Sequence, residues 1–83
     1  MVIRFHPHAK EWMKERGTTE DEVKATVEQG EQFSAKFNRI GFRRNFLFDS
    51  KWRGRYYKIK QVEVYAVKEN TDWVVITVFT RYF

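Results

Sequence analysis

The chain has 83 residues, which suffice for one small hydrophobic core but not for two, so we expect a single domain over residues 1–83. It contains no cysteine, which excludes disulfides, thiolate metal sites and a cysteine nucleophile. The net charge of +5 favours acidic partners. The first residues lack the apolar segment of a signal peptide, and the longest apolar-rich run, residues 73–79, is too short to span a membrane. We therefore expect a cytoplasmic protein without a membrane partner.

A short helix is predicted near the N-terminus. Residues 2–5 form a brief extended lead-in, and Pro7 suits the first turn of a helix because its missing N–H costs nothing there. The helix runs from about residue 8 to residue 16 and ends at Gly17. The apolar residues recur at the spacing of a buried helical stripe. They are Phe5, Ala9, Trp12 and Met13.

A second helix and four strands follow. Thr19 and Glu22 have the spacing of a capping box, and Gly30 ends the helix. From residue 31 the apolar residues alternate with polar ones, as in half-buried strands. Strands are expected over residues 31–37, 42–48, 55–68 and 73–83, with turns or loops over 38–41, 49–54 and 69–72. The order predicts an α+β fold with two N-terminal helices packed on a four-stranded antiparallel sheet (ααββββ).

One segment, residues 39–60, carries the positive charge of the chain. It contains eight basic residues and one acid, a net charge of +7, with six aromatic residues between them. Such a pattern is typical of a nucleic-acid-binding surface. The alternative is a solvated hairpin whose edge is protected by arginine and lysine. The candidate RNA-binding residues are Arg43, Arg44, Arg53, Arg55, Lys58, Trp52 and Tyr56.

Two observations suggest positions for chemistry. His8 lies on the inner stripe of the first helix, together with Arg16, and could act as a general acid or base, or could have only a structural role. In the last hairpin, a turn centred on residues 70–71 places Lys60 opposite Arg81. Like charges facing each other across two strands are unfavourable unless an anion such as phosphate bridges them. The alternatives are a register that differs by one residue, or long side chains that splay apart into water.

The sequence contains no glycine-rich phosphate loop, no nucleophile elbow and no metal-binding cluster, so we expect neither a metal nor a cofactor. Cleavage of a phosphodiester without a metal requires RNA, because the 2′-hydroxyl must serve as the nucleophile. The protein then supplies a base, cations for the phosphate and an acid for the leaving oxygen. The candidate catalytic residues are His8, Lys60, Arg81 and Tyr82. Glu63 is either a paired carboxylate or a base.

Recognisable segments occur at both ends of the chain, over residues 5–9, 12–19 and 22–23 near the start and over 60–65 and 74–79 near the end. These segments resemble the DUF4258 family. The family's histidine and arginine fall on His8 and Arg16, whereas Trp12 stands where an arginine is expected and Thr18 where isoleucine is usual. The resemblance implies a RelE/barnase-EndoU-colicin-like (BECR) fold. It also implies kinship with metal-independent ribonucleases and toxin–antitoxin mRNA interferases.

Together these observations predict a metal-independent, RNA-cleaving, toxin-like protein of the RelE type that uses the 2′-hydroxyl as its nucleophile. The alternative is a non-catalytic RNA- or protein-binding module on the same fold. The expected partners are RNA, including ribosome-bound mRNA, and an acidic antitoxin protein.

Overall fold

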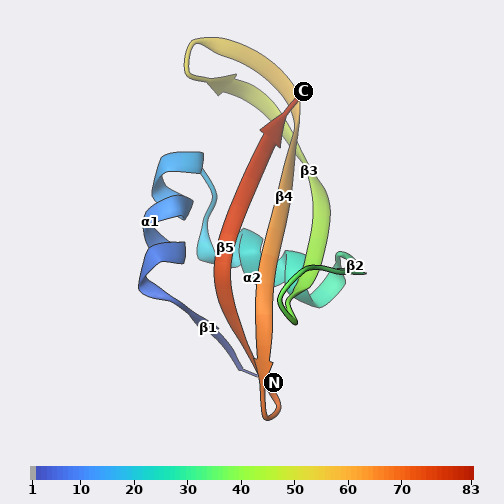
Figure 1. Ribbon diagram of the computed structural model, residues 1–83. Coiled ribbons are helices and arrows are strands. Elements are labelled where there is room, and N and C mark those ends of the chain that lie inside the picture. Colours follow the sequence, from blue (N-terminus) through green and yellow to red (C-terminus); the bar gives the residue numbers. More distant parts are fainter. Residues whose placement is uncertain (1) are drawn as a thin grey trace.

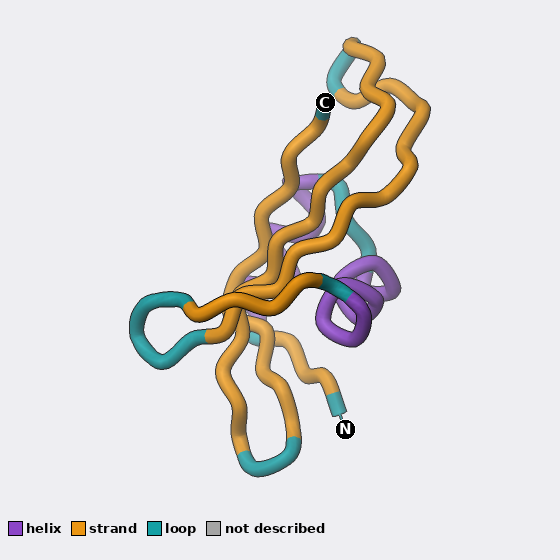
Figure 2. The backbone as a smooth tube through the Cα atoms, turned by 90° about the vertical axis from the view of Figure 1, so that its right-hand side faces the viewer, coloured by secondary structure: helices purple, strands orange, loops and turns teal. Residues whose placement is uncertain are grey.

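The computed structural model describes residues 2–83. These residues form two helices and five strands, which follow one another in the order βααββββ (Figure 1). Both helices lie on one face of the sheet, and the β2–β3 loop projects on the other side (Figure 2). The elements are β1 (Ile3–Phe5), α1 (Pro7–Arg16), α2 (Glu20–Gln29), β2 (Glu31–Ser34), β3 (Ile40–Trp52), β4 (Arg55–Glu69) and β5 (Asp72–Tyr82).

The helix ends confirm the predicted capping signals. Gly17 ends α1 in the left-handed region at φ 74° and donates its N–H to the carbonyl of Met13. Thr19 and Glu22 form the complete capping box of α2, in which each side chain accepts a hydrogen bond from the other residue's backbone N–H. Gly30 ends α2. The two helices are therefore short and sharply bounded, as their end residues dictate.

The prediction of a four-stranded antiparallel sheet is wrong. The sheet has five strands in the order β1-β5-β4-β3-β2, and β1 pairs in parallel with Trp73–Val75 of β5. Hydrogen bonds from the Trp73 N–H to the Val2 carbonyl and from the His6 N–H to the Val75 carbonyl extend this pairing. The predicted ααββββ order of a RelE/BECR-like fold is corrected accordingly. A strand of three residues is too short to show an alternating pattern, so the lead-in gave no signal of pairing.

A β-bulge changes the register of the last hairpin. Near the turn, Glu69 faces Asp72 as predicted. Between Tyr65 and Ala66 the pairing shifts by one residue, because β5 contains an extra residue there. Lys60 consequently faces Tyr82, and Arg81 faces Gln61. The predicted opposition of Lys60 and Arg81 is wrong, and the alternative of a one-residue change in register is confirmed.

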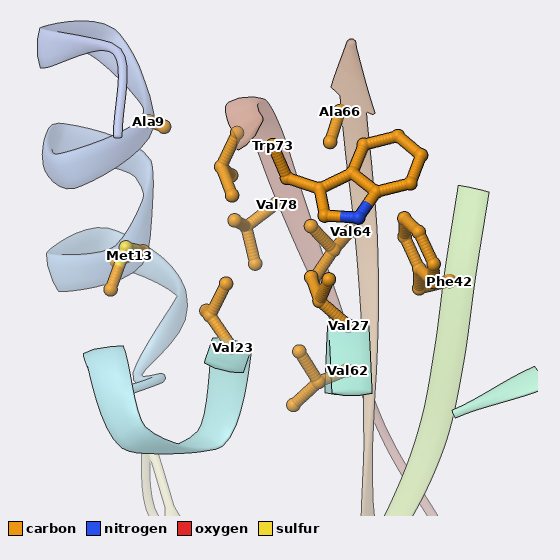
Figure 3. Close-up of a cluster of buried hydrophobic side chains, with 11 residues drawn as sticks. Ala9, Met13, Val23, Val27, Phe42, Val62, Val64, Ala66, Trp73 and Val78 are labelled. Carbon is orange, nitrogen blue, oxygen red and sulfur yellow. The ribbon is translucent and has the colours of Figure 1, made fainter. Parts of the chain in front are cut away.

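The core lies between the helices and the inner face of the sheet (Figure 3). Valines dominate it, and Val23, Val62, Val64, Val75 and Val78 are fully buried. Burying a valine contributes about 1.5–3 kcal/mol, so these side chains supply much of the driving force that holds α1 and α2 on the sheet. The core residues are Ala9, Met13, Val23, Val27, Phe42, Val62, Val64, Ala66, Trp73, Val75 and Val78.

The β3–β4 hairpin extends beyond the helices (Figure 1). The sequence predicts a loop over residues 49–54, but β3 continues to Trp52 and only Arg53 and Gly54 form the turn. Both turn residues have positive φ, 51° and 83°, as a two-residue hairpin turn requires. A bulge between Leu47 and Ser50 bends the hairpin. Within residues 2–83, no helix is both long and apolar enough to cross a membrane.

Candidate functional site on the open sheet face

Two of the four predicted catalytic residues hold the C-terminal end of α1. The Lys60 ammonium donates to the Gly17 carbonyl at 3.0 Å and forms an ion pair with Glu22 at 2.8 Å. The Tyr82 hydroxyl donates to the carbonyl of Arg16 at 2.8 Å. The last carbonyls of a helix lack partners within the helix and carry partial negative charge, which explains why a cation and a hydroxyl gather there.

The other two predicted catalytic residues lie elsewhere. His8 is exposed in the first turn of α1, about 12 Å along the helix axis from Arg16. Arg81 points to the opposite face of the sheet from Lys60 and Tyr82, because successive side chains of a strand alternate between faces. The structure therefore brings Lys60 and Tyr82 together but does not bring the four residues to one site.

A different cluster forms on the open face, centred on Glu63 of β4. The Glu63 side chain is only 6% exposed although no helix covers this face. Arg43 of β3, directly opposite, donates its Nε–H to Oε2 at 3.0 Å, and the Tyr65 hydroxyl donates to Oε1. We call Arg16, Arg43, Glu63, Tyr65 and Arg81 the open-face cluster.

The other two arginines of the cluster, Arg81 and Arg16, lie on or beside β5. Arg81 lies on the same face of β5, and its charge acts on Glu63. Arg16 extends from α1 to the edge of β5, where it donates to the Val78 carbonyl at 2.6 Å. Its guanidinium also lies 4.5 Å from the ring centre of Phe79, the residue opposite Glu63. Arg43 and Arg81 thus flank the Glu63 carboxylate, whereas Arg16 lies across β5 beside Phe79. Arg43 also lies 3.7 Å from the carboxylate of Glu31.

The surroundings of Glu63 fix its protonation state. Burial raises the pKa of the Glu63 carboxyl, but the hydrogen bonds from Tyr65 and Arg43, with the charges of Arg43 and Arg81, outweigh burial and leave the pKa below its ordinary value. The hydrogen bond to Glu63, together with burial, raises the pKa of the Tyr65 phenol. At neutral pH the cluster therefore holds an ionised carboxylate beside a protonated hydroxyl.

A groove of about 580 Å³ lies next to the cluster, between the sheet and the loop that joins β2 to β3. Tyr65 belongs to both the groove and the cluster. Gly41 lies under the Phe33 ring, and a Cβ at this position would overlap the ring. This glycine therefore leaves room for the Phe33 ring, which forms one wall of the groove. The lining residues of this aromatic groove are Phe33, Ser34, Ala35, Lys36, Phe37, Arg39, Tyr65, Thr77 and Phe79.

The family assignment follows from a sequence comparison. The family model described as "Domain of unknown function (DUF4258)" matches residues 5–80. The chain belongs to the DUF4258 family. The resemblance seen in the sequence is thereby confirmed, whereas no curated protein and no solved structure matches the chain.

The predicted RNA-binding residues of this DUF4258 protein divide among four places. Arg43 belongs to the open-face cluster, and Arg44 points to the inner face, where it donates to Gln29 at 2.6 Å. Arg53 donates to the Glu15 carbonyl at the end of α1, and the Trp52 ring stacks on Tyr82 with centroids 5.1 Å apart. The others are exposed on the β3–β4 hairpin. They are Arg55, Tyr56 and Lys58.

Sequence reasoning missed the open-face cluster as a unit. Its members come from α1 and three strands, and only a correct register aligns them. One signal was present: Gln61, Glu63 and Tyr65 alternate with valines along the longest strand, which places three polar groups on one face. Within residues 2–83, no group of three or more histidine, aspartate or glutamate side chains has the arrangement of a metal site.

Proposed function

We propose that this DUF4258 protein cleaves RNA at the open-face cluster, with Glu63 as the general base. The observation that supports this proposal best is the position of Glu63, an ionised carboxylate in the centre of a sheet face that no helix covers. Arg16, Arg43 and Arg81 carry three positive charges, against two carboxylates, Glu63 and the Glu31 side chain 3.7 Å from Arg43. The remaining positive charge suits a further anion, and a phosphodiester has the right charge and size.

The proposed reaction uses the residues of the cluster in turn. Glu63 accepts the proton of a ribose 2′-hydroxyl, whose oxygen attacks the adjacent phosphorus. The bond from phosphorus to the 5′-oxygen breaks, and the Tyr65 hydroxyl donates its proton to that oxygen. Glu63 then returns a proton to Tyr65 along their hydrogen bond. The products are a 2′,3′-cyclic phosphate and a 5′-hydroxyl end.

The arginines have a separate role in this scheme. Arg43 and Arg81 stabilise the negative charge that builds up on the phosphorus-bound oxygens, and Arg16 adds positive charge at the edge of β5. Arg43 and Tyr65 each use one lone pair of the Glu63 carboxylate. Each carboxylate oxygen has a second lone pair, so Glu63 can accept the 2′-hydroxyl without losing either partner.

The test uses an oligonucleotide of deoxyribonucleotides that contains one ribonucleotide. We expect the wild-type protein to cleave it in EDTA, only on the 3′ side of the ribonucleotide, and to leave a 2′,3′-cyclic phosphate. The all-deoxy oligonucleotide should remain intact, because it lacks the nucleophile. Cleavage of the all-deoxy strand, or no cleavage of any RNA at high protein concentration with and without ribosomes, would contradict the proposal.

A second candidate function is RNA binding without cleavage, supported by the β3–β4 hairpin. Lys51, Arg55 and Lys58 are exposed there, and within residues 2–83 none of the three forms an ion pair with an acidic side chain. Replacing all three with alanine should weaken RNA binding and make it less dependent on salt. If binding depends on these residues but the RNA stays intact, the second function replaces the first.

A further inference from the structure

Two aromatic side chains of the groove are exposed to solvent instead of buried in the core. Phe37 is 83% exposed and Phe79 is 40% exposed. Phe37 also has a φ of 61°, in the left-handed region that a bulky side chain rarely adopts. The loop is closed by hydrogen bonds from the Ala35 N–H to the Arg39 carbonyl and from the Arg39 N–H to the Lys36 carbonyl. The loop therefore holds the Phe37 ring at the groove instead of burying it.

The charges around the groove are positive at both ends. Lys36 and Arg39 come from the loop, and within residues 2–83 neither forms an ion pair with an acidic side chain. At the other end, Tyr65 and Phe79 of the groove adjoin Glu63, which is flanked by Arg43 and Arg81. A ligand that matches both features has a flat aromatic part for the rings and phosphates for the cations.

We propose that the aromatic groove binds one base of single-stranded RNA, and that this base belongs to the nucleotide whose 2′-hydroxyl is deprotonated by Glu63. This inference rests on the proposed function and adds which part of the substrate the protein recognises. Tyr65 forms part of the groove wall and hydrogen-bonds to Glu63, and Phe79 lies directly opposite Glu63. The two rings touch edge to face, with centroids 5.9 Å apart, so a base that lies over them places its own ribose beside the carboxylate.

The inference includes a preference for single strands. The faces of a base are available to aromatic side chains only when the base is unstacked, which a regular duplex prevents. The lining combines four aromatic rings with the polar side chains of Ser34, Lys36, Arg39 and Thr77. We therefore infer that the groove selects an unpaired nucleotide.

The experiment measures binding of single-stranded RNA to the Glu63→Gln protein, which keeps the RNA intact, by fluorescence anisotropy. Phe37→Ala and Phe79→Ala, each in this background, should weaken binding by roughly 5- to 150-fold, the usual range for loss of one base–aromatic stack. The control is Leu47→Ala, which removes an equally exposed apolar side chain (74%) on the β3–β4 hairpin, outside the groove. It should bind like the parent, and a duplex should bind all these proteins alike.

A second arm locates the base. Removing the base from the single ribonucleotide of the cleavable oligonucleotide should lower the affinity about as much as Phe37→Ala does, and combining the two changes should add little. Additive losses would place the base outside the groove and overturn the inference, as would groove variants that bind like Leu47→Ala. Cleavage by the wild-type protein is scored separately, so intact RNA with groove-dependent binding contradicts only the proposed reaction.

Discussion

Replacing Lys60 with methionine should destabilise the fold by about 2–3 kcal/mol. The Lys60 side chain is 7% exposed, and its ammonium group binds both the Glu22 carboxylate and the Gly17 carbonyl at the end of α1. Breaking a buried ion pair from one side costs about 3–5 kcal/mol, because the remaining charge is left without its partner. The Glu22 side chain is 23% exposed and keeps its bonds to Thr18 and Thr19. We therefore expect a loss at or below the lower end of that range.

The assay is urea unfolding monitored by tryptophan fluorescence, with Lys60→Met, Glu22→Gln and the double variant compared in a cycle. The double variant should be more stable than the sum of the two losses predicts, by about 1 kcal/mol or more. A loss below about 0.5 kcal/mol for Lys60→Met would show that Lys60 does not stabilise the end of α1.

The coupling between Lys60 and Glu22 should also depend on pH. Burial raises the pKa of the Glu22 carboxyl, but its bonds to Lys60 and Thr19 and the Lys60 charge outweigh burial and leave the pKa below 4.5, its ordinary value. Because the folded-state pKa is lowered, the pair stabilises the fold fully above the unfolded-state pKa. The stabilisation is lost as the pH falls through the folded-state pKa. Coupling that persists under strongly acidic conditions would contradict this assignment.

Two further substitutions test how the helices end and begin. Gly17→Ala should cost more than about 2 kcal/mol, because the left-handed region disfavours alanine and the new Cβ would lie 2.6 Å from the Trp52 ring; a melting temperature unchanged from wild type would show that this contact yields freely. Thr19→Ala should cost about 1 kcal/mol through loss of the capping box, measured by urea unfolding, and Thr19→Ser should restore most of it. A serine variant as unstable as the alanine variant would indicate a role for the threonine methyl group instead.

The sequence was most informative where the signal is local. A glycine after the last helical turn and a capping box depend on residues within four positions of each other, and both helices end as expected. The turn at residues 70–71 is also local and is confirmed. The alternation of Phe42 and Phe46 with polar residues placed their common side toward the core, as the structure has it.

The features that the sequence did not reveal depend on pairing between distant segments. The parallel pairing of Ile3–Phe5 with Trp73–Val75 joins residues about seventy positions apart, and three residues carry no usable period. The bulge at Tyr65 and Ala66 moves Lys60 away from Arg81 and aligns Glu63 with Phe79. A one-residue change of this kind decides which side chains share a site, because it changes every pair beyond it.

The basic segment over residues 39–60 shows why composition alone did not locate the site. Four of its basic residues bond to other parts of the protein. Arg44 donates to Gln29 and Lys60 to Gly17 on the inner face. Arg53 donates to the Glu15 carbonyl at the end of α1, and Arg43 donates to Glu63. Only those of the remaining basic residues that lie on the β3–β4 hairpin can contact a ligand there. The structure thus separates the cations that stabilise the fold from those that face solvent.

The most direct test of the central claim compares Glu63→Gln with Glu22→Gln in single-turnover cleavage of RNA. Both variants remove a paired carboxylate with a lowered pKa, one on the open face and one on the inner face. A general base typically contributes 10²–10⁴-fold, so Glu63→Gln should cleave at least about 100-fold more slowly than wild type. Glu22→Gln, where it remains folded, should cleave at nearly the wild-type rate. Equal rates for the two variants would contradict the assignment of Glu63 as the base.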